Sequence, residues 1–302
     1  MNILHIALGS HQRAQAKALA TLGSVYTIDW TKDRANLDQH ILRALTVFQP
    51  QLTFMQLQSP GLVTKETLLA IPGIKVNWTG DVRHPIPQWY IDLAPYFSVT
   101  LFNNMTDVHT MRSQDLKADY LNIGFENDVY IPNGPTISCA DIVFMGNNYK
   151  GYFPLSNYRK KMVAHLKKRY DANFAVYGTG WGEGVEDLNH QPQSEAMVYR
   201  SCKIAISLSH FNYERYTSAR PLRIMGSGAF CLSHAYQGIE KDFTPEQHLD
   251  VFHDLDHLTE QIDYYLACDG IRKTIAEAGC QRVHEQFTWQ KRIEDLLRII
   301  AT

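Results

Sequence analysis

The sequence lacks any uninterrupted apolar stretch of about 18 residues, the length at which a helix could cross a membrane. Its start, MNILHIALGS, has no basic segment followed by a long apolar one, as an export signal would have. The five cysteines form no C-x-x-C pair, and their number is odd. We therefore expect a cytoplasmic protein without a membrane span, whose cysteines are reduced and lie mostly in the core.

An excess of charge of either sign is also missing. There are 29 lysines and arginines against 31 aspartates and glutamates, a formal net charge of -2. Proteins that bind nucleic acid through a broad surface are usually strongly basic, so this class is disfavoured, although a local basic patch stays open. The 13 histidines form no H-E-x-x-H pattern, and no G-K-[ST] follows a glycine-rich loop. We expect no metal site and no P-loop.

What the chain does have is a repeated alternation of strand-like and helix-like segments, typical of parallel α/β sheets. Strands are predicted at residues 2–8, 24–29, 52–57, 75–81, 96–103, 118–125, 141–146, 174–178, 203–209, 229–233 and 250–253. Helices are predicted at residues 11–22, 35–48, 64–70, 106–114, 156–170, 194–202, 258–267, 269–286 and 288–300. The segment YIPNGPTISC at 130–139 interrupts the alternation with two prolines and a glycine, as a linker would. We predict α/β domains at residues 1–137 and 138–287, followed by a C-terminal helix at 288–302.

A glycine-rich segment, FAVYGTGWGEG at 174–184, follows one predicted strand of the second domain. Glycines at such a place let the backbone approach a ligand closely, and a plain turn is the equal alternative. We take Gly178 as a candidate binding residue. Trp181 either stacks on a nucleobase or fills the loop.

Three arginines gather after another predicted strand of the same domain, in HFNYERYTSARPLR at 210–223. Arg215, Arg220 and Arg223 carry planar guanidinium groups that suit the oxygens of a diphosphate. The strip SARPLRIMGSGAFCL at 218–232 adds a short helical run and a G-x-G turn, so Ser218, Gly226 and Gly228 join the candidates through backbone N–H groups. A solvated polar loop is the alternative.

From residue 141 onward the chain resembles the spore-maturation CgeB-like glycosyltransferases. The resemblance rests on DIVFMGNNY, FAVYGTGW, YRSCKIAISLS and TSARPLRIMGSGAFCLS, and on the final segments up to FTWQKRIEDLL. It implies a GT-B fold of class α/β, in which two Rossmann-like domains face each other across a cleft. The resemblance also implies that the C-terminal domain binds a nucleotide-sugar donor and the N-terminal domain the acceptor.

The chain departs from that family at one position of the arginine strip. Many relatives carry a glutamate that holds the donor ribose hydroxyls, where this sequence has Arg223. A guanidinium cannot accept those hydrogen bonds, so either another group takes the ribose, with Glu240 as the candidate, or the donor is bound differently.

In the N-terminal domain, two loops after predicted strands hold candidate acceptor-side residues. The first contains Gly9, Ser10 and His11, and His11 either acts as a base or merely begins the helix. The second, NWTGDVRHPIP at 77–87, brings Asp81, Arg83 and His84 into one proline-stiffened loop. Asp81 is the second candidate base, and a rigid turn with an internal Asp81–Arg83 contact is the alternative.

These patterns predict a metal-independent GT-B glycosyltransferase that moves a sugar from a nucleotide-sugar, with a UDP-sugar most expected, to a hydroxyl of a carbohydrate or glycoconjugate, without a cofactor. Two alternatives stay open. One is a transferase that acts on a hydroxymethylated DNA base, for which the basic run YRKKMVAHLKKRY at 158–170 would supply a patch; a solvated helix face is the simpler reading of that run. The other is a catalytically silent nucleotide-sugar-binding protein.

Overall fold

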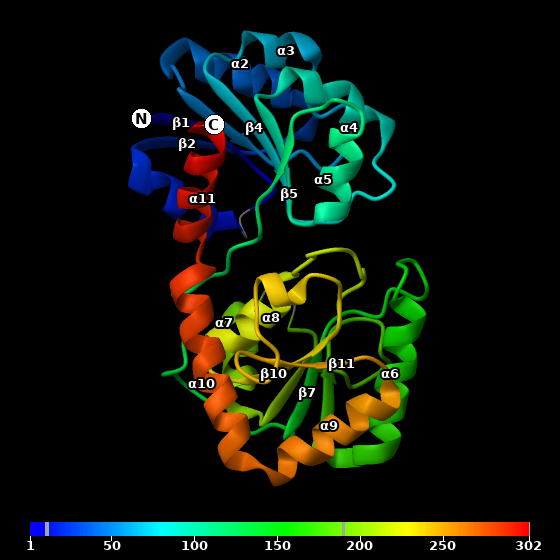
Figure 1. Cartoon of the computed structure of the whole chain (residues 1–302). Helices are drawn as coiled ribbons and strands as arrows, with labels where there is room; N and C mark the ends of the chain where they lie inside the picture. Colours follow the sequence, from blue (N-terminus) through cyan, green and yellow to red (C-terminus); the bar gives the residue numbers. More distant parts are fainter. Residues whose placement is uncertain (10–11, 189–190, 302) are drawn as a thin grey trace. The chain divides into compact units, whose positions relative to one another are not determined.

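The chain forms two compact units in the computed structural model, which describes residues 1–9, 12–188 and 191–301 (Figure 1). Unit 1 comprises Met1–Gly124 and Trp289–Thr302, and unit 2 comprises Phe125–Thr288. The boundaries therefore differ from the predicted ones. Residues 125–137 belong to unit 2, and the last helix belongs to unit 1 rather than standing apart.

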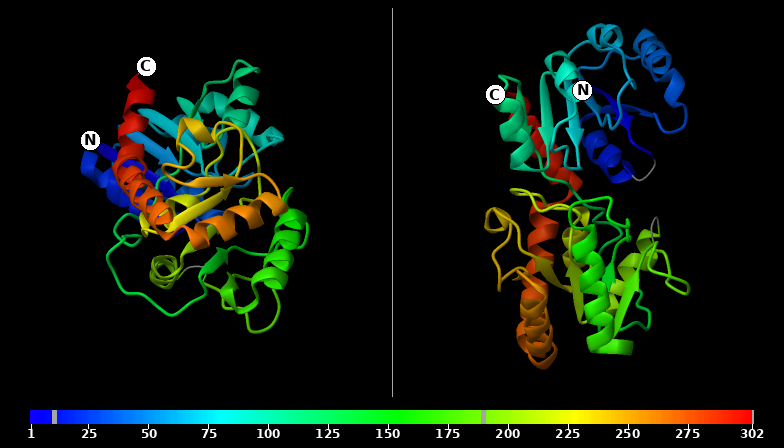
Figure 2. Two further views of the ribbon diagram at one scale, coloured as in Figure 1. Left: turned by 60° about the horizontal axis from the view of Figure 1, so that its bottom comes forward. Right: turned by 90° about the vertical axis from the view of Figure 1, so that its right-hand side faces the viewer.

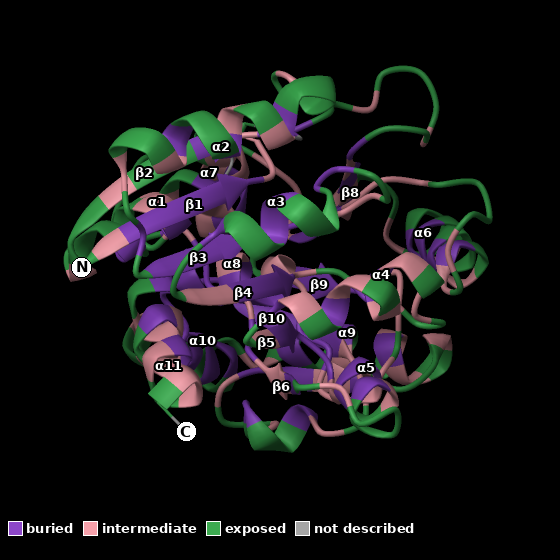
Figure 3. Cartoon of the chain, turned by 90° about the horizontal axis from the view of Figure 1, so that it is seen from above, coloured by how far each residue is buried: buried purple, intermediate pink, exposed green. Residues whose placement is uncertain are grey.

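Unit 1 is built on a six-stranded parallel sheet with the order β2-β1-β3-β4-β5-β6. The strands are β1 (Asn2–Ala7), β2 (Ser24–Asp29), β3 (Leu52–Met55), β4 (Ile74–Thr79), β5 (Val99–Phe102) and β6 (Ala118–Tyr120). The inner strands β1 and β3 are almost wholly buried, whereas the edge strand β2 is largely exposed (Figure 3). Burial on both faces explains why the inner strands read as continuous apolar runs.

Helices cover both faces of this sheet. They are α1 (Arg13–Leu19), α2 (Leu37–Val47), α3 (Lys65–Ala70), α4 (Gln88–Leu93), α5 (Met105–Arg112) and α11 (Trp289–Ala301). Leu4 and Ile6 of β1 pack with α2 and α3, while Ile3 packs on the opposite face with α1 and α11. The alternation of side chains along β1 thus divides the core of unit 1 into two layers.

The helix α11 is tied to unit 1 by its apolar stripe. Trp289, Ile293 and Leu296 are buried against the sheet, and the Trp289 ring meets the edge of Trp78 with 5.1 Å between ring centroids. Gly124 lies so close to Trp289 that a Cβ there would be 2.7 Å from the Trp289 backbone nitrogen. The stripe was visible in the sequence, but its partner was not.

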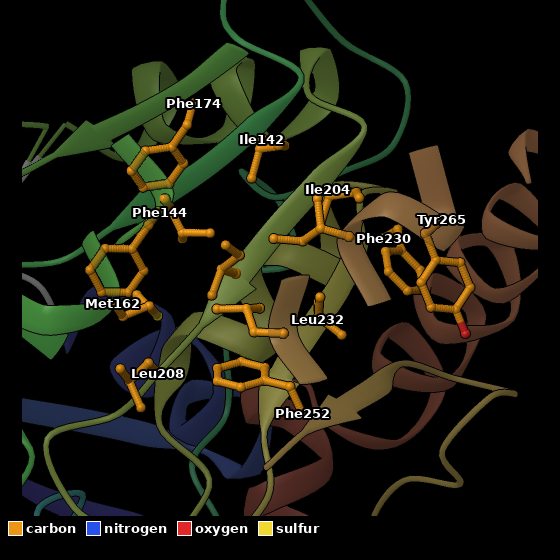
Figure 4. Packing of buried hydrophobic residues seen from close by; sticks show 14 of the residues in the cluster. Ile142, Phe144, Met162, Phe174, Ile204, Leu208, Phe230, Leu232, Phe252 and Tyr265 are labelled. Atoms are coloured by element: carbon orange, nitrogen blue, oxygen red, sulfur yellow. The ribbon is translucent and has the colours of Figure 1, made fainter. Parts of the chain in front are cut away.

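Unit 2 contains a five-stranded parallel sheet with the order β11-β10-β9-β7-β8. The strands are β7 (Ile142–Met145), β8 (Phe174–Tyr177), β9 (Ile204–Ser207), β10 (Phe230–His234) and β11 (Asp250–Phe252). Phe144, Ile204, Leu232 and Phe252 point from successive strands into one hydrophobic cluster (Figure 4).

The helices of unit 2 are α6 (Ser156–Tyr170), α7 (Pro192–Ser201), α8 (Ala219–Gly226), α9 (Leu255–Ala267) and α10 (Asp269–Gln286). Residues of α6, α9 and α10 complete the cluster of Figure 4, and the views of Figure 2 show α6 and α9 against the strands. α8 packs against β10 and α10, which also contact each other. Both units have the parallel α/β organisation that the sequence predicted.

The cysteines are free thiols: Cys202, Cys231 and Cys280 are buried, and Cys139 and Cys268 are half-buried. Over the described ranges, we find no helix that combines the length and the apolar character needed to span a membrane.

Candidate functional site

In the sheet of unit 2, the strand order reverses between β7 and β9, which makes this the topological switch point. The chain passes from β7 to its neighbour β8 on one side and then returns to β9 on the other. Ligands of open α/β sheets bind outside the carboxyl ends of strands at such a point. Met145 ends β7 and Leu208 follows β9, so these two positions mark the expected ligand site of unit 2.

Arg220, in the first turn of α8, reaches this point. Its Nε donates to the Met145 carbonyl oxygen at 2.6 Å, and its Nη1 donates to the Leu208 carbonyl oxygen at 2.8 Å. Its guanidinium carbon lies 5.4 Å from the centre of the Phe144 ring. Of the predicted arginines, Arg220 is thus the one that the structure fixes at the carboxyl ends of both central strands.

A second arginine, which the sequence analysis did not single out, lies at the same point. Arg159 of α6 is fully buried and donates to the Asn147 carbonyl at 3.0 Å and to the Leu208 carbonyl at 2.6 Å. It also bonds Nε2 of His210 at 2.9 Å. Two guanidinium groups therefore share one carbonyl oxygen, that of Leu208.

The basic run was predicted as a solvated helix face, and for Arg159 that prediction is wrong. Arg159 stands at the spacing of Met162, Val163 and Leu166, the buried stripe of α6. That spacing was the signal in the sequence that could have revealed it. Lys160, Lys161, Lys167 and Lys168 are exposed, as predicted.

The pair Arg159–Arg220 carries positive charge that no carboxylate of the described residues balances at close range. Within the described ranges, neither guanidinium has an aspartate or glutamate oxygen at ion-pair distance, and Nε of Arg159 is buried without a hydrogen-bond partner. Burial and the charge of Arg220 lower the pKa of Arg159 to about 8. Burial and the same two arginines lower the pKa of His210 to about 2, so this ring is neutral and accepts the hydrogen bond from Arg159. Such a cluster is suited to an anionic ligand.

The glycine-rich segment lies beside the same strand end. Gly178 has a left-handed backbone (φ 125°), and a Cβ on it would lie 2.8 Å from the Gly146 carbonyl oxygen. Nε1 of Trp181 donates to that carbonyl at 2.6 Å, and its ring packs edge-on against Phe144. The structure therefore brings Gly178 and Trp181 together with Arg220, with the indole fastened to the loop after β7.

Arg215 and Arg223 differ from Arg220 because each is paired with carboxylates. Arg215 binds Asp242 at 2.8 Å. Arg223 lies between Glu126 at 3.1 Å and Glu195 at 3.5 Å. Burial alone would lower the pKa of Arg223, but these glutamates raise it. The predicted arginine triplet thus consists of two members of internal ion pairs and of Arg220, which has no carboxylate partner among the described residues.

The G-x-G turn is not brought together with Arg220. Gly226 ends α8 and Gly228 (φ 80°) leads into β10, so both precede that strand, at the edge of the sheet opposite to the carboxyl ends. A Cβ on Gly226 would come within 2.4 Å of the Phe125 ring, so this glycine serves close packing. The backbone N–H groups of Gly226 and Gly228 consequently do not reach the pair Arg159–Arg220. This corrects the sequence-based prediction that these glycines bind the same ligand as Arg220.

Ser218 occupies the N-cap position of α8 without a capping hydrogen bond from its side chain. Glu240 is exposed, in a short 3-10 helix at Ile239–Lys241. Its role at a ribose stays a prediction.

In unit 1, Ser10 and His11 lie outside the described residues. Gly9 (φ 85°) donates its N–H to Asp29 at 3.1 Å. Asp81 is exposed in the loop after β4, and no ion pair between Asp81 and Arg83 is found in the described structure.

Arg83 and His84 instead adjoin Asp107, a buried carboxylate that the sequence analysis missed. Asp107 accepts the Arg83 N–H at 2.7 Å and the Asn104 side chain at 2.8 Å. Burial raises the pKa of Asp107 above its ordinary value, while these hydrogen bonds and the charges of His84 and Arg83 oppose the rise. A carboxylate with a raised pKa beside the Asp81 loop is a further candidate for proton transfer.

A family model described as glycosyl transferase-like matches residues 159–298. The whole chain also matches solved structures of GT-B glycosyltransferases. The chain has the GT-B fold. The predicted fold class is confirmed, and the family match, which begins at the buried Arg159, agrees with the predicted glycosyltransferase domain.

Three matches illustrate the likeness of this GT-B chain. A glycosyltransferase from Rickettsia africae ESF-5 has a TM-score of 0.67 and 15% identity, over 99% of this chain and 97% of that one. Sucrose-phosphate synthase from Thermosynechococcus elongatus has a TM-score of 0.66 and 11% identity, over 99% and 98%. Anabaena HepE in complex with UDP-glucose has a TM-score of 0.61 and 11% identity, over 100% and 99%. No curated protein matches the sequence.

Proposed function

We propose that this protein transfers a sugar from a nucleoside diphosphate sugar to an acceptor hydroxyl, with the diphosphate bound by Arg220 and its negative charge also stabilised by the buried Arg159. The observation that carries the proposal is this pair of guanidinium groups without a carboxylate partner in the described structure, at the carboxyl ends of β7 and β9. A diphosphate supplies the missing negative charge and accepts hydrogen bonds from the guanidinium N–H groups that do not already donate to the backbone carbonyls of Met145 and Leu208.

UDP is the nucleotide that we propose. HepE has been solved with UDP-glucose, and the pneumococcal O-GlcNAc transferase GtfA, another structural neighbour, with UDP. We also propose membership of the CgeB-like subfamily, on the sequence resemblance described above. We propose a metal-independent reaction as well, because the guanidinium groups supply the positive charge that a metal ion provides in other enzymes.

In the reaction, the bond between the anomeric carbon and the diphosphate oxygen breaks, and the bond between that carbon and the acceptor oxygen forms. Negative charge grows on the leaving phosphate, where Arg159 and Arg220 stabilise it in fixed positions. The acceptor hydroxyl loses its proton to a base, for which the candidates are His11, Asp81 and Asp107.

Thermal shift measurements with UDP, GDP, ADP, TDP and UDP-glucose test the donor site. A ligand that binds the folded protein raises its melting temperature. We expect a shift with UDP in the wild type and in Arg169→Gln, whose exposed side chain pairs with Asp263, and no shift in Arg220→Gln. An unchanged UDP shift in folded Arg220→Gln would refute the assignment. UDP binding without UDP release from UDP-glucose in the presence of sugar acceptors would instead identify a silent binder.

A further inference from the structure

Unit 1 has a hollow of about 620 Å³ beside the edge strand β2, remote in the chain from the residues of the donor site. Residues of β1, α1, β2 and α2 line it, among them His5, Arg13, Thr27, Asp29, Lys32 and Arg43. Sites for small molecules commonly occupy about 300–1,000 Å³. The hollow therefore has the size of a site for a small metabolite.

The floor of the hollow contains a buried polar group. His5 is 1% exposed; its Nε2 lies 2.9 Å from Oε1 of Gln15, and its Nδ1 lies 3.4 Å from Oγ1 of Thr27. Burial lowers the pKa of His5 to about 4, so the ring is neutral. Because Gln15 Oε1 can only accept, we assign the ring proton to Nε2, and Nδ1 accepts from the Thr27 hydroxyl. The oxygen of Thr27, which is exposed, keeps acceptor capacity for a ligand hydroxyl.

The rim carries three cations with no side-chain partner among the residues that the structure describes: Arg13, Lys32 and Arg43. The two aspartates of the hollow do not neutralise them directly. Asp33 pairs with His40 at 3.2 Å and accepts from Asn36.

The other aspartate is fixed in place. Asp29 Oδ1 accepts from Gly9 and from Thr31, whereas Oδ2 has no partner within the described residues. Partial burial would raise the pKa of Asp29, but the hydrogen bonds from Thr31 and Gly9 and the charge of Lys32 lower it overall. A fixed, ionised carboxylate with a free oxygen is suited to accept hydrogen bonds from hydroxyl groups.

We propose that this hollow binds a carbohydrate that carries an anionic group, a phosphate or a carboxylate. Arg13, Lys32 and Arg43, which have no side-chain partner among the described residues, bind the anionic group: the guanidinium forks of the two arginines match either oxyanion, and Lys32 adds a point charge. Asp29 Oδ2 and the Thr27 hydroxyl accept hydrogen bonds from sugar hydroxyls. The described residues contain no cluster of three or more metal-ligating side chains.

Isothermal titration of the full chain tests the proposal with four probes: glucose 6-phosphate, glucuronate, glucose and inorganic phosphate. We expect glucose 6-phosphate or glucuronate to bind at least tenfold more tightly than glucose and phosphate. The double variant Arg13→Gln/Arg43→Gln should weaken that binding at least tenfold. Both side chains are exposed, so the variant keeps its fold, and it should bind UDP like the wild type. Arg34→Gln, which changes an exposed arginine outside the hollow, should bind the probe normally.

The variant Arg220→Gln separates this site from the donor site. Retained probe binding in Arg220→Gln supports a site in unit 1, even if UDP proves not to bind the protein at all. Four results would each overturn the proposal. They are loss of probe binding in Arg220→Gln, unweakened probe binding in Arg13→Gln/Arg43→Gln, an affinity for glucose equal to that for the anionic sugars, and no binding of any probe.

Discussion

Replacing Gly146 by alanine should damage the donor site while leaving unit 2 folded. A Cβ at this position would lie 2.9 Å from Nη2 of Arg220, 3.1 Å from Cζ of Phe144 and 3.3 Å from Nη1 of Arg159. Gly146 is not among the glycines with a left-handed backbone, so alanine is not strained by its own φ. The added methyl group acts by displacing the two guanidinium groups and the Phe144 ring beneath them.

The size of the effect follows from the contacts that must give way. Moving Arg220 lengthens its hydrogen bonds to Met145 and Leu208, now 2.6 and 2.8 Å. Overpacking of a filled site costs about 1–3 kcal/mol. Weakening one charge-assisted hydrogen bond to the ligand by about 1.4 kcal/mol reduces its affinity tenfold. We therefore expect UDP to bind Gly146→Ala at least tenfold more weakly, with unit 2 destabilised by about 1–3 kcal/mol.

The assay is isothermal titration with UDP, together with urea unfolding to measure stability. Gly270→Ala is the matched control, because a Cβ there meets nothing within 4 Å. The reasoning is refuted if folded Gly146→Ala binds UDP as tightly as the wild type, since the Arg220 guanidinium would then not contact the ligand.

Three further predictions concern stability. The pKa of His5 is lower in the folded state than its unfolded value near 6.5, so its contribution to the free energy of unfolding is complete above pH 6.5 and falls toward pH 4. In urea titrations, the difference in unfolding free energy between wild type and His5→Gln should therefore change by about 1–2 kcal/mol between pH 7 and pH 5. Arg223→Met should cost about 3 kcal/mol by leaving two glutamates unpaired, and Arg223→Glu should cost at least as much without improving UDP binding; a stable Arg223→Glu would contradict this. On α10, Gly279→Ala would bring a Cβ to 2.1 Å from the His248 carbonyl oxygen and should cost about 3 kcal/mol in thermal unfolding, whereas Gly270→Ala should stabilise by about 0.5 kcal/mol; equal melting temperatures would argue against this packing.

The helical periodicity of the basic run held more information than its composition. Counting charges predicted a solvated face, but Arg159 shares the stripe of Met162 and Leu166 and is buried. Charge composition says which residues are costly to bury, whereas the stripe says which residues the fold buries regardless of that cost.

The arginine strip, in contrast, shows what the local sequence could not reveal. Arg215, Arg220 and Arg223 look equivalent in sequence, and only Arg220 stays without a carboxylate in the described structure. Their partners come from distant segments, Asp242 for one and Glu126 for another. Nothing local to the strip encodes which arginine a carboxylate will neutralise.

The sequence by itself determined the two parallel α/β sheets, because buried strands and amphipathic helices leave their periods in the order of apolar residues. It also pointed to the strip of Arg215, Arg220 and Arg223 as an anion site. Only the tertiary structure decided that α11 packs on unit 1, that Arg159 joins Arg220, and that Arg223 is committed to two glutamates. These outcomes depend on contacts between segments far apart in the chain, whose distances no local pattern of residues can specify.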